Sequence, residues 1–480
     1  MSMSLSRRRF LTGSAGVLLL SALPACSKSR RQPPSGVNAA LQALGRSTLR
    51  HPGSRPDPNL PPATDTLPGI EHVVILMLEN HSFDNLFGTL GRGDGFNLDS
   101  HGRPTATNPY SDGRVQRAFH MPTTCQLPST PSNDWTASHN AYDNGANDGF
   151  VSTTVSAASA TMVGAVAMGY WNGDDLPFTH SLAKEFPIGD RWFGSMLGPT
   201  HPNRRFLIAG TSSGLTFDVS TSLPGLPGDA AFLKPVAGTI FNSLDDHGVS
   251  WTNYSATFPT GATPELYPLN DLATGTRNRK PLPQFFTDTA AGELAEVVLI
   301  DPDYSTQTQE NPQNLVVGEA LLAMVVNALG GSRLWGSTML VVTYDESGGY
   351  YDHVPPPPAV PPDNVAPVVM EGEQRYDGFA RYGFRVPSVV VSPYAKPGHV
   401  SHLVYDHTSI LGLIERKWNL PALTYRDANA NDLTDFLDLQ ALLEANPTFP
   451  KLPPLAPPGD TPGALACTTK GPGTIPPPGP

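Results

Sequence analysis

The sequence predicts an α/β fold in which a central β-sheet lies between layers of helices. The runs VVILML at 73–78 and MLVVTY at 339–344 carry no charge, which is typical of strands buried on both faces of a sheet. An apolar segment with helical spacing at 315–329 precedes the second run, so helix and strand alternate as in layered α/β proteins. We therefore expect one large α/β domain over residues 68–446.

An export signal is expected over residues 1–26. Residues 6–11 read SRRRFL, a twin-arginine pattern, and the apolar stretch that follows is too short to span a bilayer as a permanent helix. The partner that this pattern implies is the twin-arginine export machinery. Cys26 follows Leu-Pro-Ala, which resembles a bacterial lipoprotein cleavage site and leaves a lipid anchor at this cysteine open. We expect an exported protein that is periplasmic, attached to the cell envelope as a lipoprotein, or secreted.

Two flanking segments lack the pattern of a packed core. Residues 27–67 are rich in Pro, Ser and Arg and predict a flexible tether, and residues 447–480 predict a Pro-rich tail that is extended or disordered. Cys125 and Cys467 would be able to form a disulfide in an oxidising compartment, but their spacing gives no evidence that they meet.

The composition argues against some classes of partner. The chain has 31 Lys and Arg against 43 Asp and Glu, which gives a formal charge of −12. A protein of this charge is not attracted to a nucleic-acid backbone or an anionic membrane by general electrostatics. We expect no nucleic-acid partner.

Polar side chains stand directly after the two buried runs. Glu79 and Asn80 follow the first run, and Asp345 and Glu346 follow the second. Ligands of open α/β sheets bind outside the carboxyl ends of the strands, so these side chains are expected at one sheet edge. Three carboxylates and an amide in that position indicate a metal site.

The segment GPTHPNR at 198–204 places a hydroxyl between two prolines. Pro199 and Pro202 restrict the backbone on both sides of Thr200, and a helix is expected to begin near Asn203. A hydroxyl at a helix N-terminus lies where backbone N–H groups favour an anion. The alternative is that Thr200 only caps the helix.

The remaining elements complete the layered pattern. Paired glycines and a Pro run follow the second carboxylate pair and predict a rigid loop that can approach a ligand closely. Other helices are expected near 182, at 241–246 and, after a Thr or Ser cap at 408–409, from 410. Further strands are expected at 248–254, 297–300 and 386–392.

Three histidines are candidates for proton transfer. His139 lies in the polar segment 134–150, His353 precedes the Pro run, and His407 stands at the mouth of the helix expected from 410. Histidine suits acid–base chemistry near neutral pH. The alternatives are an irregular surface loop around His139 and a capping role for His407.

Four sequence motifs, taken together, are specific enough to compare this chain with known protein families. They are HVVILMLENHSFDNLFG at 72–88, GPTHPNRRFLIAGT at 198–211, TYDESGGYYDHVPPP at 343–357 and YDHTSILGLIE at 405–415. With these motifs the sequence resembles the bacterial phosphoesterase family that contains non-specific phospholipases C and related acid phosphatases. The resemblance implies an alkaline-phosphatase-like fold, a three-layer sandwich with a central sheet between helices.

The resemblance also implies roles for single residues. The metal ligands of the family fall on Glu79, Asn80, Asp345 and Glu346, and its nucleophile falls on Thr200, which would also touch the metal. An all-oxygen shell of this kind suits Ca²⁺, Mg²⁺ or Mn²⁺ better than zinc. A cation that touches the hydroxyl would lower its pKa, so that it attacks phosphorus and forms a phosphothreonine.

Two further residues are expected near the substrate. Arg204 would orient the nucleophile loop or contact phosphate, and an ion pair that stabilises the helix is the alternative. Many relatives have Glu-His-Pro where this chain has Glu310-Asn311-Pro312. Asn311 can hydrogen-bond phosphate but cannot relay a proton, so we expect proton transfer or substrate preference to differ from that of these relatives.

We therefore expect an exported, metal-dependent hydrolase of phosphoric esters, phospholipase C-like, whose substrate is a phospholipid or a small phosphoester. One alternative is an acid phosphatase that acts on monoesters. Another is a non-catalytic surface lipoprotein that binds phosphorylated ligands, although such a protein has no need of a nucleophile beside a metal. A sulfatase is disfavoured because position 200 lacks the Cys or Ser signature of that class.

Overall fold

The computed structural model describes residues 36–126, 131–153, 164–219, 234–267, 277–453, 467 and 473–479. The expected export signal and Cys26 lie outside these residues. Within the described part of the chain, no helix is both long enough and apolar enough to cross a membrane.

The centre of the protein is a mixed sheet, which among the described residues has eight strands in the order β12-β6-β11-β10-β1-β9-β7-β8. The strands from β10 to β8 run parallel, whereas β11 is antiparallel to β10 and to β6. Their bounds are β1 (His72–Leu78), β6 (Ile188–Gly189), β7 (Trp251–Ser255), β8 (Arg279–Pro281), β9 (Val297–Asp301), β10 (Thr338–Tyr344), β11 (Ser388–Val391) and β12 (Val400–Ser401).

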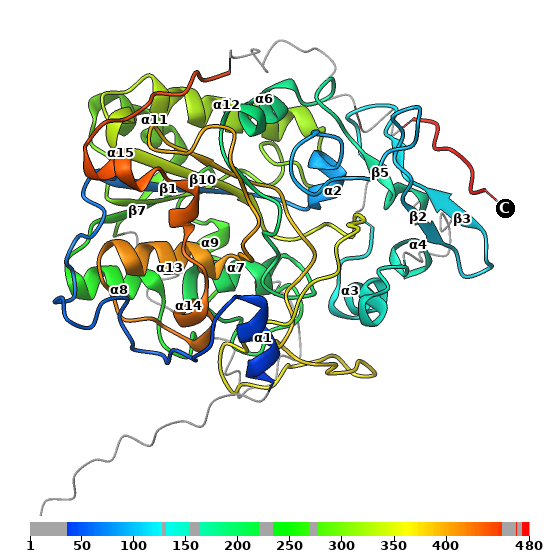
Figure 1. Ribbon diagram of the computed structural model, residues 1–480, viewed down its shortest axis with the longest axis horizontal. Coiled ribbons are helices and arrows are strands. Elements are labelled where there is room, and N and C mark those ends of the chain that lie inside the picture. The colour runs from blue at the N-terminus through cyan, green and yellow to red at the C-terminus, as the bar shows by residue number, and fades with distance from the viewer. Residues whose placement is uncertain are drawn as a thin grey trace, which may run out of the picture. The chain divides into compact units, whose positions relative to one another are not determined.

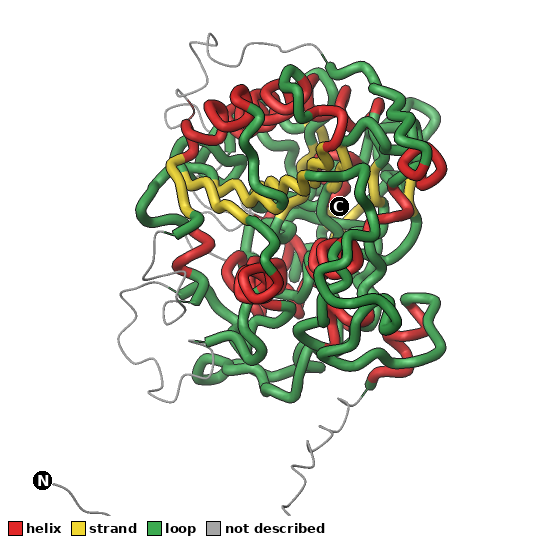
Figure 2. Tube along the Cα trace, turned by 90° about the vertical axis from the view of Figure 1, so that its left-hand side faces the viewer, coloured by secondary structure: helices red, strands yellow, loops and turns green. Residues whose placement is uncertain are grey.

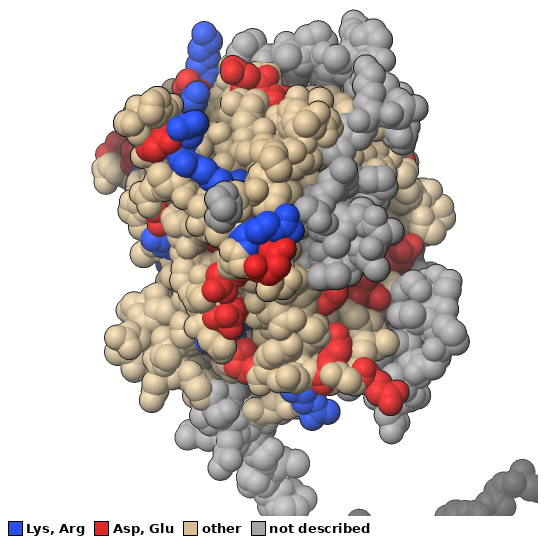
Figure 3. All heavy atoms as spheres, turned by 90° about the vertical axis from the view of Figure 1, so that its right-hand side faces the viewer, with Lys and Arg blue, Asp and Glu red and all other residues tan. Residues whose placement is uncertain are grey.

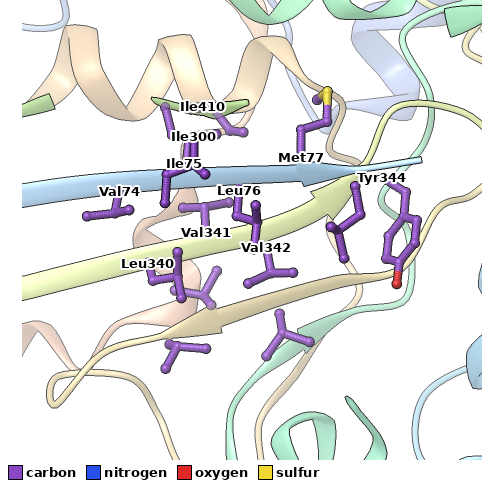
Figure 4. Packing of buried hydrophobic residues seen from close by; sticks show 14 of the residues in the cluster. Val74, Ile75, Leu76, Met77, Ile300, Leu340, Val341, Val342, Tyr344 and Ile410 are labelled. Carbon is purple, nitrogen blue, oxygen red and sulfur yellow. The ribbon is translucent and has the colours of Figure 1, made fainter. Parts of the chain in front are cut away.

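The two apolar runs are the neighbouring strands β1 and β10, and every residue of both is buried. Aliphatic side chains fill both faces of the sheet here, as the uninterrupted apolar pattern predicted. In Figure 4, Ile75 of β1 lies beside Ile300 of β9 and Ile410 from a covering helix. The strands pair in parallel register up to Leu78 and Tyr344, so the chain leaves both strands at the same edge of the sheet.

Helices cover both faces of the sheet (Figures 1 and 2). This arrangement confirms the predicted α/β fold with a central sheet between helices. One layer contains α6 (Pro177–Glu185), α11 (Leu282–Ala291) and α12 (Leu315–Gly330), and the other contains α7 (Thr200–Ala209), α8 (Ile240–His247), α13 (Thr408–Lys417) and α14 (Tyr425–Asn429).

Shorter elements lie around these layers, and two small sheets are formed by β2 with β3 and by β4 with β5. The helical elements are α1 (Val37–Ala43), α2 (Phe83–Phe87), α3 (Trp135–Tyr142), α4 (Phe150–Thr153), α9 (Ala262–Glu265) and α15 (Leu439–Leu443). The short strands are β2 (Thr107–Pro109), β3 (Val115–Arg117), β4 (Phe119–His120) and β5 (Gly169–Tyr170).

Residues 36–67 differ from the predicted flexible tether. Helix α1 buries Ala40 in a small apolar cluster that includes Tyr425. The amide of Asn419 donates hydrogen bonds to three backbone carbonyls within residues 57–61. Local composition could not predict this packing, because the partners come from the far end of the chain.

The C-terminal tail is attached at two places. Cys467 forms a disulfide with Cys125, so the pairing that the sequence left open is formed. Gly479 exchanges two backbone hydrogen bonds with Val115, of 2.9 and 3.2 Å. The tail is therefore held against the domain at Cys467 and Gly479.

The surface carries both signs of charge. On the face shown in Figure 3, Asp and Glu side chains are scattered over the lower half, and a short row of Lys and Arg lies towards the upper left. Most of the drawn surface between them is uncharged. This distribution gives the visible face no broad basic area that would attract a nucleic-acid backbone.

Candidate active site

Glu79 and Asn80 follow β1, and Asp345 and Glu346 follow β10. Because the strands end level with each other, both pairs stand at one edge of the sheet, as predicted. The backbone N–H of Asn80 donates a hydrogen bond of 3.1 Å to Oδ1 of Asp345. Asn80 has a φ of 69°, a left-handed conformation that Asn adopts more readily than most residues. This turn joins the two strand ends.

Thr200 is the first residue of α7, and its hydroxyl reaches the same edge. Its Oγ1 donates a hydrogen bond of 3.3 Å to Oδ1 of Asn80. Nδ2 of Asn203 donates to the carbonyls of Gly198 (2.9 Å) and Pro199 (3.0 Å), which fixes the turn before the helix. The N-cap residue of α7 is Pro199, so the alternative in which Thr200 caps the helix is not observed. The hydroxyl is therefore held beside Asn80 at a helix N-terminus.

Arg204, one turn further along α7, ties the helix to both strands. Its guanidinium lies 3.1 Å from Oε1 of Glu79 and 3.1 Å from Oδ2 of Asp345. It also donates to the backbone carbonyl of Leu78 at 3.2 Å and stacks over the ring of Tyr304. The structure therefore shows an ion pair with both strand ends, which holds the Thr200 helix in place.

The carboxylates of the site are buried, and this determines their electrostatics. Burial raises the pKa of the Glu79 carboxyl well above its usual value, although Arg204 acts in the opposite direction. Burial and the charge of Asp345 also raise the pKa of Glu346. Oε2 of Glu79 is buried without a hydrogen-bond partner. A buried carboxylate oxygen in this situation calls for a proton or a cation.

Glu346 is held from two sides. Nδ2 of Asn133 donates to Oε1 at 2.6 Å, and the backbone N–H of Gly348 donates to Oε2 at 2.7 Å. Gly348 has a φ of 63°, and a Cβ added there would lie 2.1 Å from the carbonyl oxygen of Asn80. Only glycine fits this close approach of the two strand ends.

Comparison with known proteins identifies the family of this chain. The model of the phosphoesterase family matches residues 70–421, which contain every side chain described above. The chain belongs to the phosphoesterase family. It is accordingly a hydrolase that acts on phosphoric ester bonds.

Relatives of this phosphoesterase cover most of its length. Phospholipase C B of Mycobacterium tuberculosis is 28% identical over 89% of each chain. Non-specific phospholipase C6 of Arabidopsis thaliana is 31% identical over 76% of this chain and 72% of the relative. A solved protein of the alkaline phosphatase superfamily from Vibrio parahaemolyticus is 11% identical over 72% of this chain and 76% of its own, with a TM-score of 0.34.

The side chains at the strand ends can be compared with the donors that a metal ion requires. Among the described residues, no group of three or more His, Cys, Asp or Glu side chains is arranged to hold a metal ion. Arg204 contacts the carboxylates of both Glu79 and Asp345. The free Oε2 of Glu79, the amide of Asn80 and the hydroxyl of Thr200 are nevertheless oxygen donors of the type that hard cations prefer. The donor chemistry thus fits a divalent cation.

His139 contacts its own helix and a neighbouring loop. Its Nδ1–H donates to the carbonyl of Trp135 at 2.7 Å, and its ring stacks on Tyr376 at 4.0 Å between centroids. Nε2 lies 3.8 Å from Asp377, and the residue lines a cavity of about 900 Å³. None of these contacts connects His139 with Thr200.

The other two histidines occupy different positions. Nδ1 of His353 lies 2.7 Å from Asp84 and Nε2 lies 3.3 Å from Asp94, so both nitrogens face carboxylates outside the strand ends. Nε2 of His407 donates to the backbone oxygen of Asp345 at 2.6 Å. His407 is the N-cap residue of α13 but makes no side-chain capping bond, and the Thr or Ser cap expected there is not observed. Only His407 contacts a strand-end residue directly.

The two residues of the segment 310–311 have different contacts. The carboxyl of Glu310 lies close enough to that of Glu79 to act on it electrostatically, and burial raises the pKa of both. The side chain of Asn311 is buried and bonds with Tyr350. The sequence pointed to Asn311, whereas it is Glu310 that touches a strand-end carboxylate.

Two further contacts of the site were missed from sequence. Asn133 holds Glu346, and Asp218 accepts a hydrogen bond of 2.7 Å from the backbone N–H of His201, next to Thr200. Both residues lie in loops with ordinary turn composition. No local pattern separates them from other Asn and Asp residues, because their partners are distant in sequence.

Proposed function

We propose that this phosphoesterase is a metal-dependent hydrolase of the phospholipase C type, with Thr200 as nucleophile. The observation that carries the proposal is the Thr200 hydroxyl, held by Asn80 at the N-terminus of α7 beside buried carboxylates. The relatives that cover most of the chain are named phospholipase C, which supports a phosphodiester substrate such as a phospholipid.

The proposed reaction has two displacements at phosphorus. In the first, Oγ1 of Thr200 forms a bond to phosphorus, the bond to the alcohol leaving group breaks, and that alcohol is released with a proton. In the second, water attacks the phosphothreonine, restores the Thr200 hydroxyl and releases the phosphoryl product. Asn80 orients the hydroxyl, and Arg204 fixes α7 against the strand ends. The N–H groups of the first turn of α7 favour the phosphate oxygens.

The proposed cofactor is Ca²⁺, Mg²⁺ or Mn²⁺. Glu79, Asn80, Asp345, Glu346 and Thr200 would hold it, and when bound it would lower the pKa of the hydroxyl and neutralise phosphate oxygens. The partnerless Oε2 of Glu79 supports this assignment.

We also propose that the protein is exported through the twin-arginine pathway, with attachment at Cys26 or release as a soluble protein. The SRRRFL pattern and the apolar stretch after it support export. The Cys125–Cys467 disulfide supports an oxidising compartment, where such bonds persist.

The test is hydrolysis by the purified full-length protein of p-nitrophenyl phosphorylcholine and p-nitrophenyl phosphate, with and without chelator. We expect turnover of the diester that is lost with chelator and returns when a divalent cation is added. Turnover of the monoester alone would replace the proposal by an acid phosphatase. Binding of a divalent cation without turnover of either ester would favour the non-catalytic alternative.

A further inference from the structure

Asp218 lies beside the proposed nucleophile Thr200, because its carboxylate is hydrogen-bonded to the next residue, His201. Its Oδ1 accepts the backbone N–H of His201 at 2.7 Å, and the backbone N–H of Val219 donates to Nδ1 of His201 at 2.9 Å. These two hydrogen bonds run in opposite directions between the same two segments. The carboxylate of Asp218 is therefore fixed at the start of α7, next to Thr200.

The N–H that Asp218 occupies belongs to the first turn of α7. Backbone N–H groups in that position are the ones that favour an anion at a helix N-terminus. A phosphate whose phosphorus is attacked by Thr200 lies at the same helix end. A phosphate ester that binds at the N-terminus of α7 therefore lies close to the carboxylate of Asp218.

The charges around this position are mainly negative. Asp218 lies within electrostatic range of Asp345 and Arg204, and it acts in turn on Glu310 and Glu346. Arg204 supplies a positive charge at this position, but it already forms ion pairs with the strand-end carboxylates of Glu79 and Asp345. The charge of Asp218 thus adds to an existing excess of carboxylates.

We infer that Asp218 is a specificity-determining residue, which disfavours phosphomonoesters relative to phosphodiesters. This inference rests on the proposed attack of Thr200 on phosphorus. A monoester carries nearly two negative charges at neutral pH, whereas a diester carries one and has no second proton to lose. The second charge is repelled by the Asp218 carboxylate, so the penalty falls on the monoester.

The experiment compares kcat/KM for p-nitrophenyl phosphate and p-nitrophenyl phosphorylcholine at pH 7.5 in the metal-loaded full-length protein. In Asp218→Asn the charge is removed while Oδ1 remains as the acceptor for the His201 N–H. We expect the ratio of monoester to diester activity to rise about ten-fold, the size expected for one charge pair a few ångströms apart near a protein surface. Asp218→Glu, which keeps the charge, should stay close to the original ratio.

The matched control is Asp246→Asn, an exposed carboxylate on α8. It removes the same charge from the protein at an exposed residue that makes none of the Asp218 contacts, and it should leave the ratio unchanged. A ratio within two-fold of the original in Asp218→Asn, or an equal rise in Asp246→Asn, would overturn the inference.

A binding measurement separates this inference from the proposed function. Calorimetry of inorganic phosphate, mainly a dianion, and of dimethyl phosphate, a monoanion, requires no turnover. In Asp218→Asn, the ratio of the affinity for phosphate to the affinity for dimethyl phosphate should rise about ten-fold relative to the original protein. If neither ester is turned over, the proposed function fails while this shift still decides the role of Asp218. If both esters are turned over and neither ratio moves, only the Asp218 inference fails.

Discussion

Two buried arginines each bridge two carboxylates in this protein, and their surroundings differ. Arg204 contacts Glu79 and Asp345, and Arg385 contacts Asp84 at 3.0 Å and Asp352 at 2.8 Å. In both clusters one carboxylate follows β1 and the other follows β10. The same two strands thus supply two ionic clusters to the protein.

The clusters differ in how completely their oxygens are satisfied. In the Arg385 cluster, Oδ2 of Asp84 accepts both from the backbone and from the ring of His353, and Oδ2 of Asp352 accepts from the backbone. In the Arg204 cluster, Oε2 of Glu79 has no partner. A saturated cluster can only hold the chain together, whereas an unsaturated one has capacity left for a ligand. This difference supports a structural role for the Arg385 cluster and the proposed catalytic role for the Arg204 cluster.

The largest effect is expected from Thr200→Ala. Removal of the nucleophile should lower kcat/KM for the diester by about 10⁴-fold, since no other group replaces the attacking oxygen. Steady-state kinetics checks this, and the thermal midpoint should remain unchanged because the hydroxyl contributes one long hydrogen bond. Thr287→Ala, at an exposed position of α11, is the matched control and should retain full activity. Full activity in Thr200→Ala would remove the nucleophile assignment.

Arg385→Met should reduce the free energy of unfolding by about 3–5 kcal/mol, because it leaves two buried carboxylates without their cation. Urea denaturation measures this loss. Added Ca²⁺, Mg²⁺ or Mn²⁺ should not restore it, since the remaining oxygens already have partners. Recovery of stability with a cation would show that this cluster, too, has ligand capacity.

Arg204→Met should destabilise the protein less when a divalent cation is present than when it is absent. The cation can take over the charge compensation of Glu79 and Asp345, so we expect about 1–3 kcal/mol of recovery at a cation concentration well above its Kd. Denaturation curves with and without cation provide the measurement. An equal loss in both conditions would contradict the distinction between the clusters.

The smallest effect concerns pH and His353. Burial lowers the pKa of His353, but the hydrogen bond and charge of Asp84 outweigh it and raise the pKa above 6.5. The stabilisation is therefore fully present below about pH 6.5, where the histidine is charged in both states, and is lost as pH rises through the folded pKa. His353→Gln should flatten this slope by about 1 kcal/mol or less. An unchanged profile would show that Asp84 does not stabilise the imidazolium.

The parts of the site that could be predicted are those carried by local pattern. The runs at 73–78 and 339–344 are apolar throughout, so the strands and the polar residues after them follow from burial on both faces. Thr200 was indicated by the prolines around it. These signals are contained within a few residues of chain.

The parts that could not be predicted are contacts between distant segments. Asn133 meets Glu346, and Glu310 meets Glu79, only because the folded chain brings four loops to one edge. His353 looked suited to proton transfer by residue type, yet Asp84 and Asp94 engage both of its nitrogens. Residue type sets what a side chain can do, and long-range packing sets which of these roles is open to it.

The level ends of β1 and β10 have a consequence for engineering. The register of these two paired strands fixes the distance between Glu79 and Asn80 on one side and Asp345 and Glu346 on the other. This distance does not depend on the length of the chain that connects the strands. Insertions, deletions or grafted domains in surface loops within residues 81–337 should leave the two strand ends aligned, provided that the loops carrying Asn133, Thr200 and Glu310 are unchanged. A single residue inserted within β10 would instead shift Asp345 and Glu346 to the opposite faces of the sheet and dismantle the site at once.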